Sequence, residues 1–282
     1  MSALLLVLDE ESQLSGGMTE NRSGADHRGG DGSAGDADYG SIGSDYSRYR
    51  QPEPAFVDAI HASLDGAQTL VNVGAGAGSY EPGHLAVTAV EPSAAMRAQR
   101  PAGAAPVVDA IAEDLPFADR SFDAALASFT VHQWRDLHGG LREVRRVTRG
   151  PIVILTCDPS ALGRSWINDY APEVISTEAS RYPTITDVRS SLGGTVRVDN
   201  LPIPLGCVDG FSEAYYGRPE ALLDPGARRA NSAWSFVSRQ VEDRFDRALR
   251  ADLASGAWDD RYGHLRTQPT FEGSLRLIVG HW

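Results

Sequence analysis

The sequence predicts an α/β protein built on a mostly parallel β-sheet. From Thr69 onward, short apolar runs alternate with segments of helical periodicity, which is the pattern of parallel strands joined by crossover helices. The clearest helix is residues 137–147, whose apolar side chains share one face while its arginines occupy the solvated side. The apolar runs that we interpret as strands are residues 69–74, 85–91, 106–109, 122–129, 152–157, 195–203 and 274–279.

The chain is predicted to contain a tail, a core and an insert. Residues 15–45 are rich in Gly, Ser and Asp and hold few large apolar side chains, and residues 1–45 are predicted to be a disordered tail. Residues 46–204 and 271–282 are predicted to form the core. Residues 205–270 are too many for a loop within a compact sheet, so we expect an inserted helical cap there. Its main element is an amphipathic helix predicted from the apolar repeat in residues 237–253.

Charge and residue usage restrict the possible partners. The 282 residues carry a net charge of -12, which disfavours binding to nucleic-acid phosphates and to anionic membrane surfaces. The 26 side chains that are either Lys or Arg are all arginines, so lysine chemistry such as Schiff-base formation is excluded. Cys157 and Cys207 lack the spacing of a zinc site, and no metal is predicted.

Residues 3–8 form an apolar stretch that is followed by acidic residues and has no basic residue before it, the reverse of the charge order in a signal peptide. The small number of cysteines suits a reducing compartment. We therefore expect a cytoplasmic protein without a membrane span that acts on a small molecule. The oligomeric state is left open.

A glycine-rich loop and an acidic residue together predict a nucleoside site. Gly74, Gly76 and Gly78 directly follow the first predicted strand, where glycine permits positive φ and lets a ligand approach the main chain. Glu91 ends the second predicted strand, where a carboxylate can accept hydrogen bonds from both hydroxyls of a ribose. Either feature alone is weak, but the pair in this βαβ setting favours a nucleoside ligand.

The loop is expected to bind a cationic cofactor rather than a dinucleotide. Its spacing is GxGxG, whereas the dinucleotide fingerprint is GxGxxG with a helix that begins at the loop and holds the pyrophosphate. Glu81 and Pro82 follow the loop. We expect Glu81 to repel a pyrophosphate and Pro82 to accompany a shortened or absent helix.

At these residues the chain resembles the class I S-adenosylmethionine-dependent methyltransferases, over about residues 46–160. The glycine loop resembles the first motif of that family, and Glu91-Pro92-Ser93 with Met96 resembles its ribose-binding segment. Residues 112–117, Ala-Glu-Asp-Leu-Pro-Phe, resemble its adenine-side segment. The resemblance implies a Rossmann-like, seven-stranded sheet and S-adenosylmethionine as the cofactor. One departure is Asn72, which stands where the family usually has an acidic residue.

The resemblance also implies roles for individual residues. The methionyl part of the cofactor would lie on the glycine loop, its ribose on Glu91 and its adenine on Met96, beside the backbone of Ala112 and the side chain of Glu113. Ser128 ends a predicted strand and is expected beside the sulfonium. Arg50 is expected to pair with the carboxylate of the cofactor, under a lid formed by Tyr46 or Tyr49. The predicted cofactor-binding residues are Tyr46, Tyr49, Arg50, Gly74, Ala75, Gly76, Glu91, Pro92, Met96, Ala112, Glu113 and Ser128.

Candidates for catalysis and for acceptor binding follow the fourth and fifth predicted strands. His132 is the candidate general base, because a neutral imidazole near the site of methyl transfer can accept a proton from an oxygen or nitrogen nucleophile. The candidates for acceptor contacts are Asp158, Pro159, Trp166, Asp169, Tyr170 and residues 207–216.

The predicted function is methyl transfer from S-adenosylmethionine to a small-molecule acceptor by in-line displacement. Two alternatives stay open from the sequence. One is an NAD(P)-dependent oxidoreductase, because a glycine-rich loop after a strand is also found in dinucleotide-binding proteins. The other is a protein that binds S-adenosylmethionine without turnover, because Asn72 departs from the family pattern and a fold does not by itself imply activity.

Overall fold

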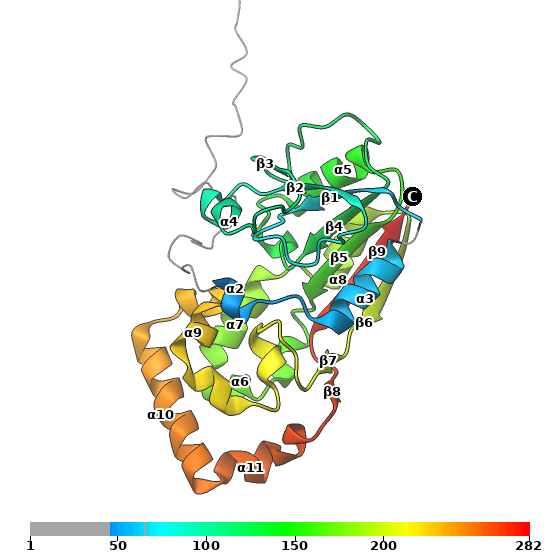
Figure 1. The fold of residues 1–282 in the computed structure, drawn as a ribbon. Helices are drawn as coiled ribbons and strands as arrows, with labels where there is room; N and C mark the ends of the chain where they lie inside the picture. Colours follow the sequence, from blue (N-terminus) through cyan, green and yellow to red (C-terminus); the bar gives the residue numbers. More distant parts are fainter. Residues whose placement is uncertain (1–45, 65) are drawn as a thin grey trace, which may run out of the picture.

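The computed structural model describes residues 46–64 and 66–282, and its central element is a seven-stranded sheet (Figure 1). Its strands are β1 (Thr69–Val73), β2 (Ala86–Val90), β3 (Val107–Val108), β4 (Ala124–Ser128), β5 (Ile152–Cys157), β6 (Thr195–Asn200) and β9 (Leu275–His281). The spatial order is β3-β2-β1-β4-β5-β9-β6. Strands β1 to β5 pair in parallel, and β9 is antiparallel to both β5 and β6. The Rossmann-like, mostly parallel sheet predicted from the sequence is confirmed.

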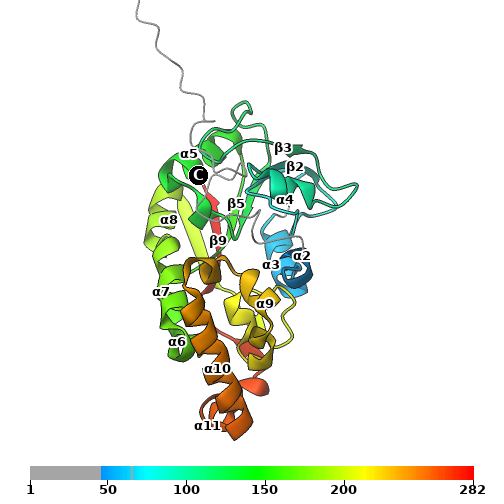
Figure 2. The same ribbon diagram turned by 90° about the vertical axis from the view of Figure 1, so that its left-hand side faces the viewer.

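Helices cover both faces of this sheet. On one face α3 (Pro54–Ser63) buries Phe56 and Ile60 in a cluster with Leu126 of β4. On the other face α5 (Leu137–Val147) and α8 (Ile185–Leu192) pack on a cluster that contains the neighbouring Ala125. Successive strand residues point to opposite faces, so β4 contributes to both clusters. Figure 2 shows α5 and α8 on one side of the sheet and α3 on the other.

A second group of helices lies beyond the carboxyl-terminal ends of the parallel strands (Figure 1). Phe245 is fully buried there, and its ring contacts Trp166, Tyr170 and Trp234. Segments before and after β6 therefore share one apolar core. The helices are α6 (Ile167–Tyr170), α7 (Pro172–Arg181), α9 (Pro225–Arg229), α10 (Arg239–Ser255) and α11 (Ala257–Tyr262). No helix in the described part of the chain is both long and apolar enough to cross a membrane.

Shorter elements complete the chain and include those that approach the functional site. The short helices are α2 (Tyr46–Tyr49) and α4 (Ala94–Ala98), and the 3-10 turns are η2 (Val131–Gln133), η3 (Leu162–Arg164), η4 (Ser212–Tyr215), η5 (Pro219–Leu223), η6 (Ser232–Phe236) and η7 (Gly263–Arg266). The helices α6 and α7, which belong to the predicted core, pack with helices of the insert, so no clear boundary separates the two parts. The division into a core and a cap at residues 205–270 therefore stays a prediction. The tail predicted for residues 1–45 lies outside the described residues.

Two predicted boundaries differ from the structure. The strand predicted over 195–203 is divided, because Pro202 has no N–H with which to continue the ladder beyond β6. The residues that follow form β7 (Ile203–Pro204), which pairs with β8 (Thr270–Phe271) in a separate two-stranded sheet. The long helix α10 begins at Arg239, so Val237 precedes it rather than forming its first apolar position.

A buried carboxylate joins the insert to the sheet. Glu213 in η4 is 1% exposed and accepts hydrogen bonds from the backbone N–H of Ser274, at 2.9 Å, and from its hydroxyl. Ser274 directly precedes β9. Burial raises the pKa of Glu213 to about 7, although the hydrogen bonds from Ser274 favour the charged form.

Replacing Phe245 by alanine is expected to destabilise the fold by about 3–5 kcal/mol, because the cavity would open among three other aromatic side chains. The matched control is Arg247→Ala, an exposed position on the same helix. Urea denaturation of both variants measures the difference. A loss below about 1 kcal/mol for Phe245→Ala would show that this aromatic core is not essential for stability.

Glu213 also gives a prediction for the pH dependence of stability. Since its pKa is raised in the folded state, the folded protein holds this proton more tightly than the unfolded chain. Stability from this group is therefore present below about pH 4.5 and is lost as the pH rises through about 7. Between pH 5 and pH 8 the wild type should lose roughly 2–3 kcal/mol more than Glu213→Gln does in chemical denaturation. Parallel stability curves for the two proteins would contradict this assignment.

Candidate functional site

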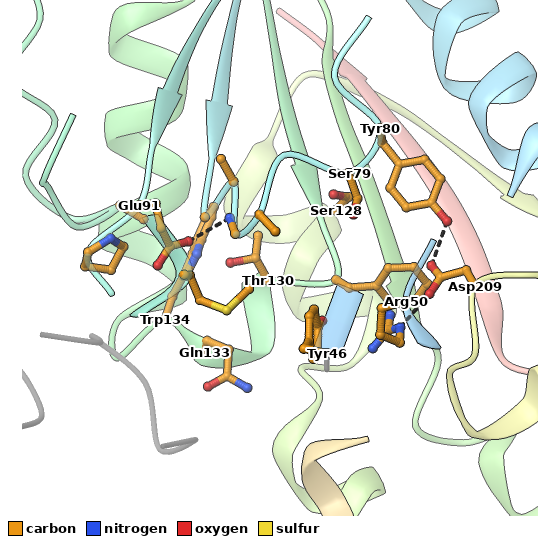
Figure 3. A pocket seen from close by; sticks show the side chains of 18 of the residues that line it. Tyr46, Arg50, Ser79, Tyr80, Glu91, Ser128, Thr130, Gln133, Trp134 and Asp209 are labelled. Atoms are coloured by element: carbon orange, nitrogen blue, oxygen red, sulfur yellow. Dashed lines mark hydrogen bonds and ion pairs between the residues drawn. The ribbon is translucent and has the colours of Figure 1, made fainter. Parts of the chain in front are cut away.

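A pocket of about 850 Å³, its open mouth included, lies at the carboxyl-terminal ends of β1, β2 and β4 (Figure 3). Its wall combines the loop after β1, the ends of β2 and β4, and side chains from α2 and the insert. The lining residues are Tyr46, Arg50, Gly74, Ala75, Gly76, Ala77, Ser79, Tyr80, Glu91, Pro92, Met96, Ala110, Ala112, Ser128, Phe129, Thr130, Gln133, Trp134 and Asp209.

The glycine loop depends on the absence of a side chain at Gly74. This residue has φ +70°, and its N–H donates to the carbonyl of Val90 at 2.8 Å. A Cβ atom at this position would lie only 1.9 Å from Oγ1 of Thr130, beyond the end of β4. Only glycine therefore fits both the backbone conformation and the close approach of Thr130.

Glu91 is held in place by the loop that it faces. One of its carboxylate oxygens accepts the N–H of Gly76 at 2.8 Å, and the other accepts the N–H of Ser93 at 2.8 Å. The residue is 6% exposed, and burial raises its pKa, while the two backbone hydrogen bonds act in the opposite direction. The carboxylate is therefore fixed at the pocket wall and still has acceptor capacity for a ligand.

The charge environment of the loop differs in part from the prediction. As expected, the described chain has no helix between β1 and β2. The predicted repulsion by Glu81 is wrong, because its carboxylate pairs with Arg100 at 2.8 Å and also accepts from Asn72. Both charged side chains of this pair are at least nine-tenths buried. Glu81 is thus neutralised beneath the loop, and the missing helix N-terminus is what makes this a poor site for a diphosphate.

Apolar side chains line the pocket at the end where Glu91 lies. Met96 of α4 is 4% exposed, and Pro92 and Ala112 lie in the same wall. Trp134 adds a flat indole that lies against α5, where a Cβ on Gly140 would come within 2.6 Å of the ring. Such a wall suits a flat aromatic base.

Glu113 is directed away from the pocket. It does not belong to the pocket lining, and its carboxylate accepts the backbone N–H of Asp136 at 3.0 Å, just before α5. The neighbouring Ala112 does line the pocket. The contacts of the Glu113 side chain and of the Ala112 backbone with adenine both stay predictions.

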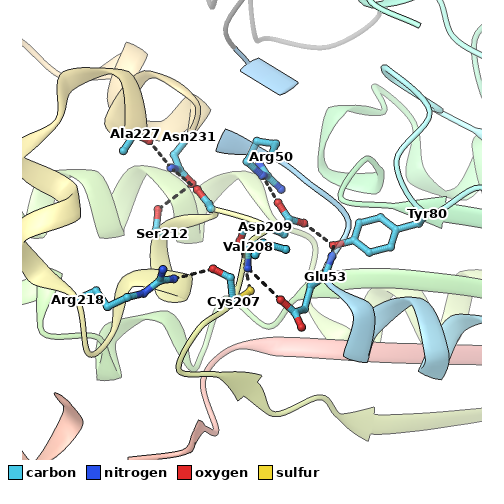
Figure 4. Close-up of polar contacts among 11 residues, drawn as sticks. Arg50, Glu53, Tyr80, Cys207, Val208, Asp209, Ser212, Arg218, Ala227 and Asn231 are labelled. Carbon is cyan, nitrogen blue, oxygen red and sulfur yellow. Dashed lines mark hydrogen bonds and ion pairs between the residues drawn. The ribbon is translucent and has the colours of Figure 1, made fainter. Parts of the chain in front are cut away.

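Three segments that are distant in the sequence meet at Asp209. Its carboxylate pairs with the Nε of Arg50 at 2.5 Å and accepts the hydroxyl of Tyr80 at 2.6 Å (Figure 4). The side chains of Arg50 and Asp209 are 12% and 3% exposed. The guanidinium also lies over the rings of Tyr46 and Phe129. Arg50 is thus held in the pocket wall by a partner that lies 159 residues further along the chain.

The two tyrosines of α2 have different positions. Tyr46 lines the pocket, as expected for a residue that closes over a ligand. Tyr49 does not line it, because its hydroxyl donates to Asp224 at 2.7 Å, at the N-terminus of α9. Its carbonyl also accepts the N–H of Gly210. Tyr49 therefore fastens α2 to the insert, and Tyr46 is the tyrosine of the pair that faces the site.

His132 lies in a second, smaller pocket of about 420 Å³. Its ring stacks on Tyr182 with a centroid distance of 4.3 Å. The two pockets share Tyr46, Arg50 and Phe129, so they are adjacent. The lining of the second pocket is Tyr46, Arg50, Phe129, His132, Glu178, Tyr182, Phe211, Ala230, Asn231 and Ser232. A catalytic role for His132 stays a prediction.

Most of the other candidates for acceptor contacts are used in packing or in surface hydrogen bonds. Trp166 and Tyr170 are buried in the aromatic core around Phe245, and Asp169 accepts the hydroxyl of Tyr262. Asp158 pairs with Arg276. None of these residues lines either pocket. From the predicted stretch 207–216, only Asp209 and Phe211 line a pocket.

Several pocket residues were not predicted from the sequence. Thr130 and Gln133 follow β4 closely, and the rule that ligands bind at the carboxyl ends of parallel strands could have indicated both. Glu178 and Tyr182 lie on or just after α7, in a segment whose pattern indicates only a helix. Asp209 lies within the predicted stretch 207–216, but its pairing with Arg50 and Tyr80 has no local signal in the sequence.

Comparisons with known proteins agree on one fold. Residues 71–151 match the family model of a methyltransferase domain. A crystal structure from Anabaena variabilis, described as a candidate methyltransferase from an antibiotic biosynthesis pathway, aligns with a TM-score of 0.78 and 27% identity, covering 84% of this chain and 100% of that one. YcgJ of Bacillus subtilis aligns with a TM-score of 0.50 and 16% identity, covering 79% of this chain and 96% of YcgJ, and shows the fold alone.

The uncharacterised protein YafE of Escherichia coli strain K12 is a curated relative. It is 39% identical over 124 residues, which is 40% of this chain and 57% of YafE. The chain thus aligns with little more than half of the length of YafE.

The glycine loop yields a direct test. Gly74→Ala is expected to destabilise the protein by at least about 1–2 kcal/mol from the positive φ alone, with a further cost for displacing Thr130. Gly83→Ala is the matched control, because Gly83 has no positive φ and its Cβ would meet no atom within 4 Å. Thermal unfolding measures both variants. Equal melting temperatures for Gly74→Ala and the wild type would contradict the close approach of Thr130.

Proposed function

We propose that this chain is a class I S-adenosylmethionine-dependent methyltransferase and that its acceptor is a small molecule. The observation that carries the proposal is the fixed carboxylate of Glu91 facing a glycine loop in a single pocket. Bound there, S-adenosylmethionine would supply a methyl group activated by a sulfonium. No catalytic metal is needed for such a displacement.

The residues of the first pocket fit this cofactor. The glycine loop exposes backbone at the end of β1, and a Cβ at Gly74 would close the space that Thr130 needs. Glu91 can receive ribose hydroxyls, and Met96 with Trp134 can enclose an adenine. At the other end Arg50 lines the pocket, where its guanidinium can attract a carboxylate.

The positions of these residues indicate which part of the cofactor each would contact. Glu91 and the apolar wall bind the nucleoside end, so the reactive end lies toward Ser128, Phe129 and Arg50. Of these residues, Phe129 and Arg50 also line the second pocket, in which an acceptor can meet the methyl group. Rigid positioning of two reactants accounts for a large part of the rate in such displacements.

Three observations support a small acceptor in the cytoplasm. The second pocket is a small hollow that adjoins the first, about 420 Å³ with its open mouth included. The net charge of -12 disfavours a nucleic-acid acceptor. Cys157 and Cys207 are both free and buried, as suits a reducing compartment.

Of the two alternatives, the oxidoreductase has less support, because the described chain has no helix between the glycine loop and β2 to bind a pyrophosphate. The binding protein without turnover differs from the proposal only in activity. Release of S-adenosylhomocysteine during incubation with an acceptor library separates these two. Stabilisation by NAD or NADP and not by S-adenosylhomocysteine would favour the oxidoreductase.

Glu91→Gln is expected to weaken S-adenosylhomocysteine binding by about 10- to 100-fold, because hydrogen bonds from the ribose to a charged acceptor would be replaced by weaker ones. Calorimetric titration of the purified protein measures this loss. Asp114→Asn removes an exposed carboxylate from a neighbouring loop and should leave the affinity unchanged. Wild-type affinity in Glu91→Gln would exclude the proposed ribose contact.

A further inference from the structure

We propose that the second pocket is an acceptor site for an amine and that Glu178 is the anion that binds the amine nitrogen. This inference rests on the proposed methyl-transfer function. It is carried by one buried carboxylate, by the aromatic side chains around it and by the charges of the neighbouring residues.

Glu178 is a buried carboxylate with no cationic partner among the described residues. It lies near the end of α7, is 8% exposed and lines the second pocket. Its Oε2 accepts a hydrogen bond from the hydroxyl of Ser212 at 3.2 Å. In the described part of the chain, no Arg or His nitrogen lies within 4.0 Å of it. A buried charge without a counterion is costly, so a cationic or N–H-donating ligand would be stabilised here.

Arg181 and Arg50 lower the pKa of Glu178, but neither lies close enough to form an ion pair with it. The guanidinium of Arg50 is bound to Asp209 through Nε, and Arg181 donates to the hydroxyl of Ser232. Burial raises the pKa of Glu178, whereas Ser212, Arg181 and Arg50 favour its charged form. Since Asp209 balances Arg50, the carboxylate of Glu178 remains as the acidic group of the pocket wall.

Aromatic side chains surround the same space. Phe211 and Tyr182 line the pocket together with Phe129 and Tyr46. Arg50 already lies over the rings of Phe129 and Tyr46, with its Cζ 5.1 Å and 5.7 Å from their centroids. No arginine of the described chain lies over Phe211 or Tyr182, whose rings contact Phe129 and His132. Aromatic faces beside one carboxylate are a combination that recognises ammonium groups.

The charge movement in methyl transfer explains why Glu178 favours nitrogen. An amine that binds as ammonium first loses a proton to solvent. Its nitrogen lone pair then forms the new N–C bond, while the electron pair of the breaking C–S bond stays on sulfur. The positive charge thus moves from sulfur to nitrogen, where Glu178 can stabilise it. A carboxylate or phenolate acceptor would instead place a second negative charge beside Glu178, which is unfavourable.

The test measures ligand binding to the full chain saturated with S-adenosylhomocysteine. The probes are phenethylamine, butylamine and cyclohexylmethylamine, each compared with the alcohol and the carboxylate of the same carbon skeleton. We expect at least one amine to bind about 10-fold or more tightly than its alcohol, and its carboxylate to bind more weakly still. Calorimetric titration gives each affinity.

Glu178→Gln keeps the shape of the side chain and an acceptor for Ser212 but removes the charge. It should weaken binding of that amine by about 10- to 100-fold and leave the alcohol and S-adenosylhomocysteine unaffected. Glu173→Gln is the matched control, because Glu173 lies on the same helix, pairs with Arg244 and does not line the pocket. This control should bind all probes as the wild type does.

The outcomes separate this inference from the proposed function. If S-adenosylhomocysteine binds but no amine does, if alcohols or carboxylates bind as tightly as amines, or if Glu178→Gln retains amine affinity, the amine site is overturned and the methyltransferase proposal stands. If the wild type binds no S-adenosylhomocysteine, the proposed function fails and this inference fails with it.

Discussion

The site depends on the close approach of backbone segments at the ends of parallel strands. The loop after β1 can face Glu91 only because Gly74 adopts a positive φ and leaves room for Thr130. The N–H of Gly76 then points at the carboxylate of Glu91, which the N–H of Ser93 also holds. Each contact uses backbone atoms whose positions follow from strand register, so the sheet itself orients the site.

Buried charges organise the rest of the site. Arg100 neutralises Glu81 beneath the glycine loop, and Asp209 holds Arg50 in the wall shared by the two pockets. A buried charge is tolerated when it is paired, and breaking such a pair costs more than the pair itself contributes. Glu178 differs, because it faces a pocket without a paired cation in the described chain. Paired charges therefore shape the walls, while the unpaired carboxylate is the group available to a ligand.

The helices beyond the strand ends close the site from one side. Tyr49 binds α2 to α9, and the neighbouring Arg50 reaches Asp209 in the insert. Glu213 joins the same insert to the start of β9 through Ser274. The start and the end of the described chain are thus connected through residues of the insert, which makes its position part of the geometry of both pockets.

The sequence by itself determined the features that depend on local spacing. Alternating apolar runs specified the parallel strands, and glycine spacing with Glu91 at a strand end located the first pocket, because the period of a strand and the conformational freedom of glycine are local properties. Only the tertiary structure decided which charges meet. Glu81 was expected to repel a ligand but pairs with Arg100, Glu113 turns toward Asp136, and Arg50 meets Asp209 across 159 residues. Electrostatic pairing depends on distance in space, and that distance is set by how the insert folds back on the sheet.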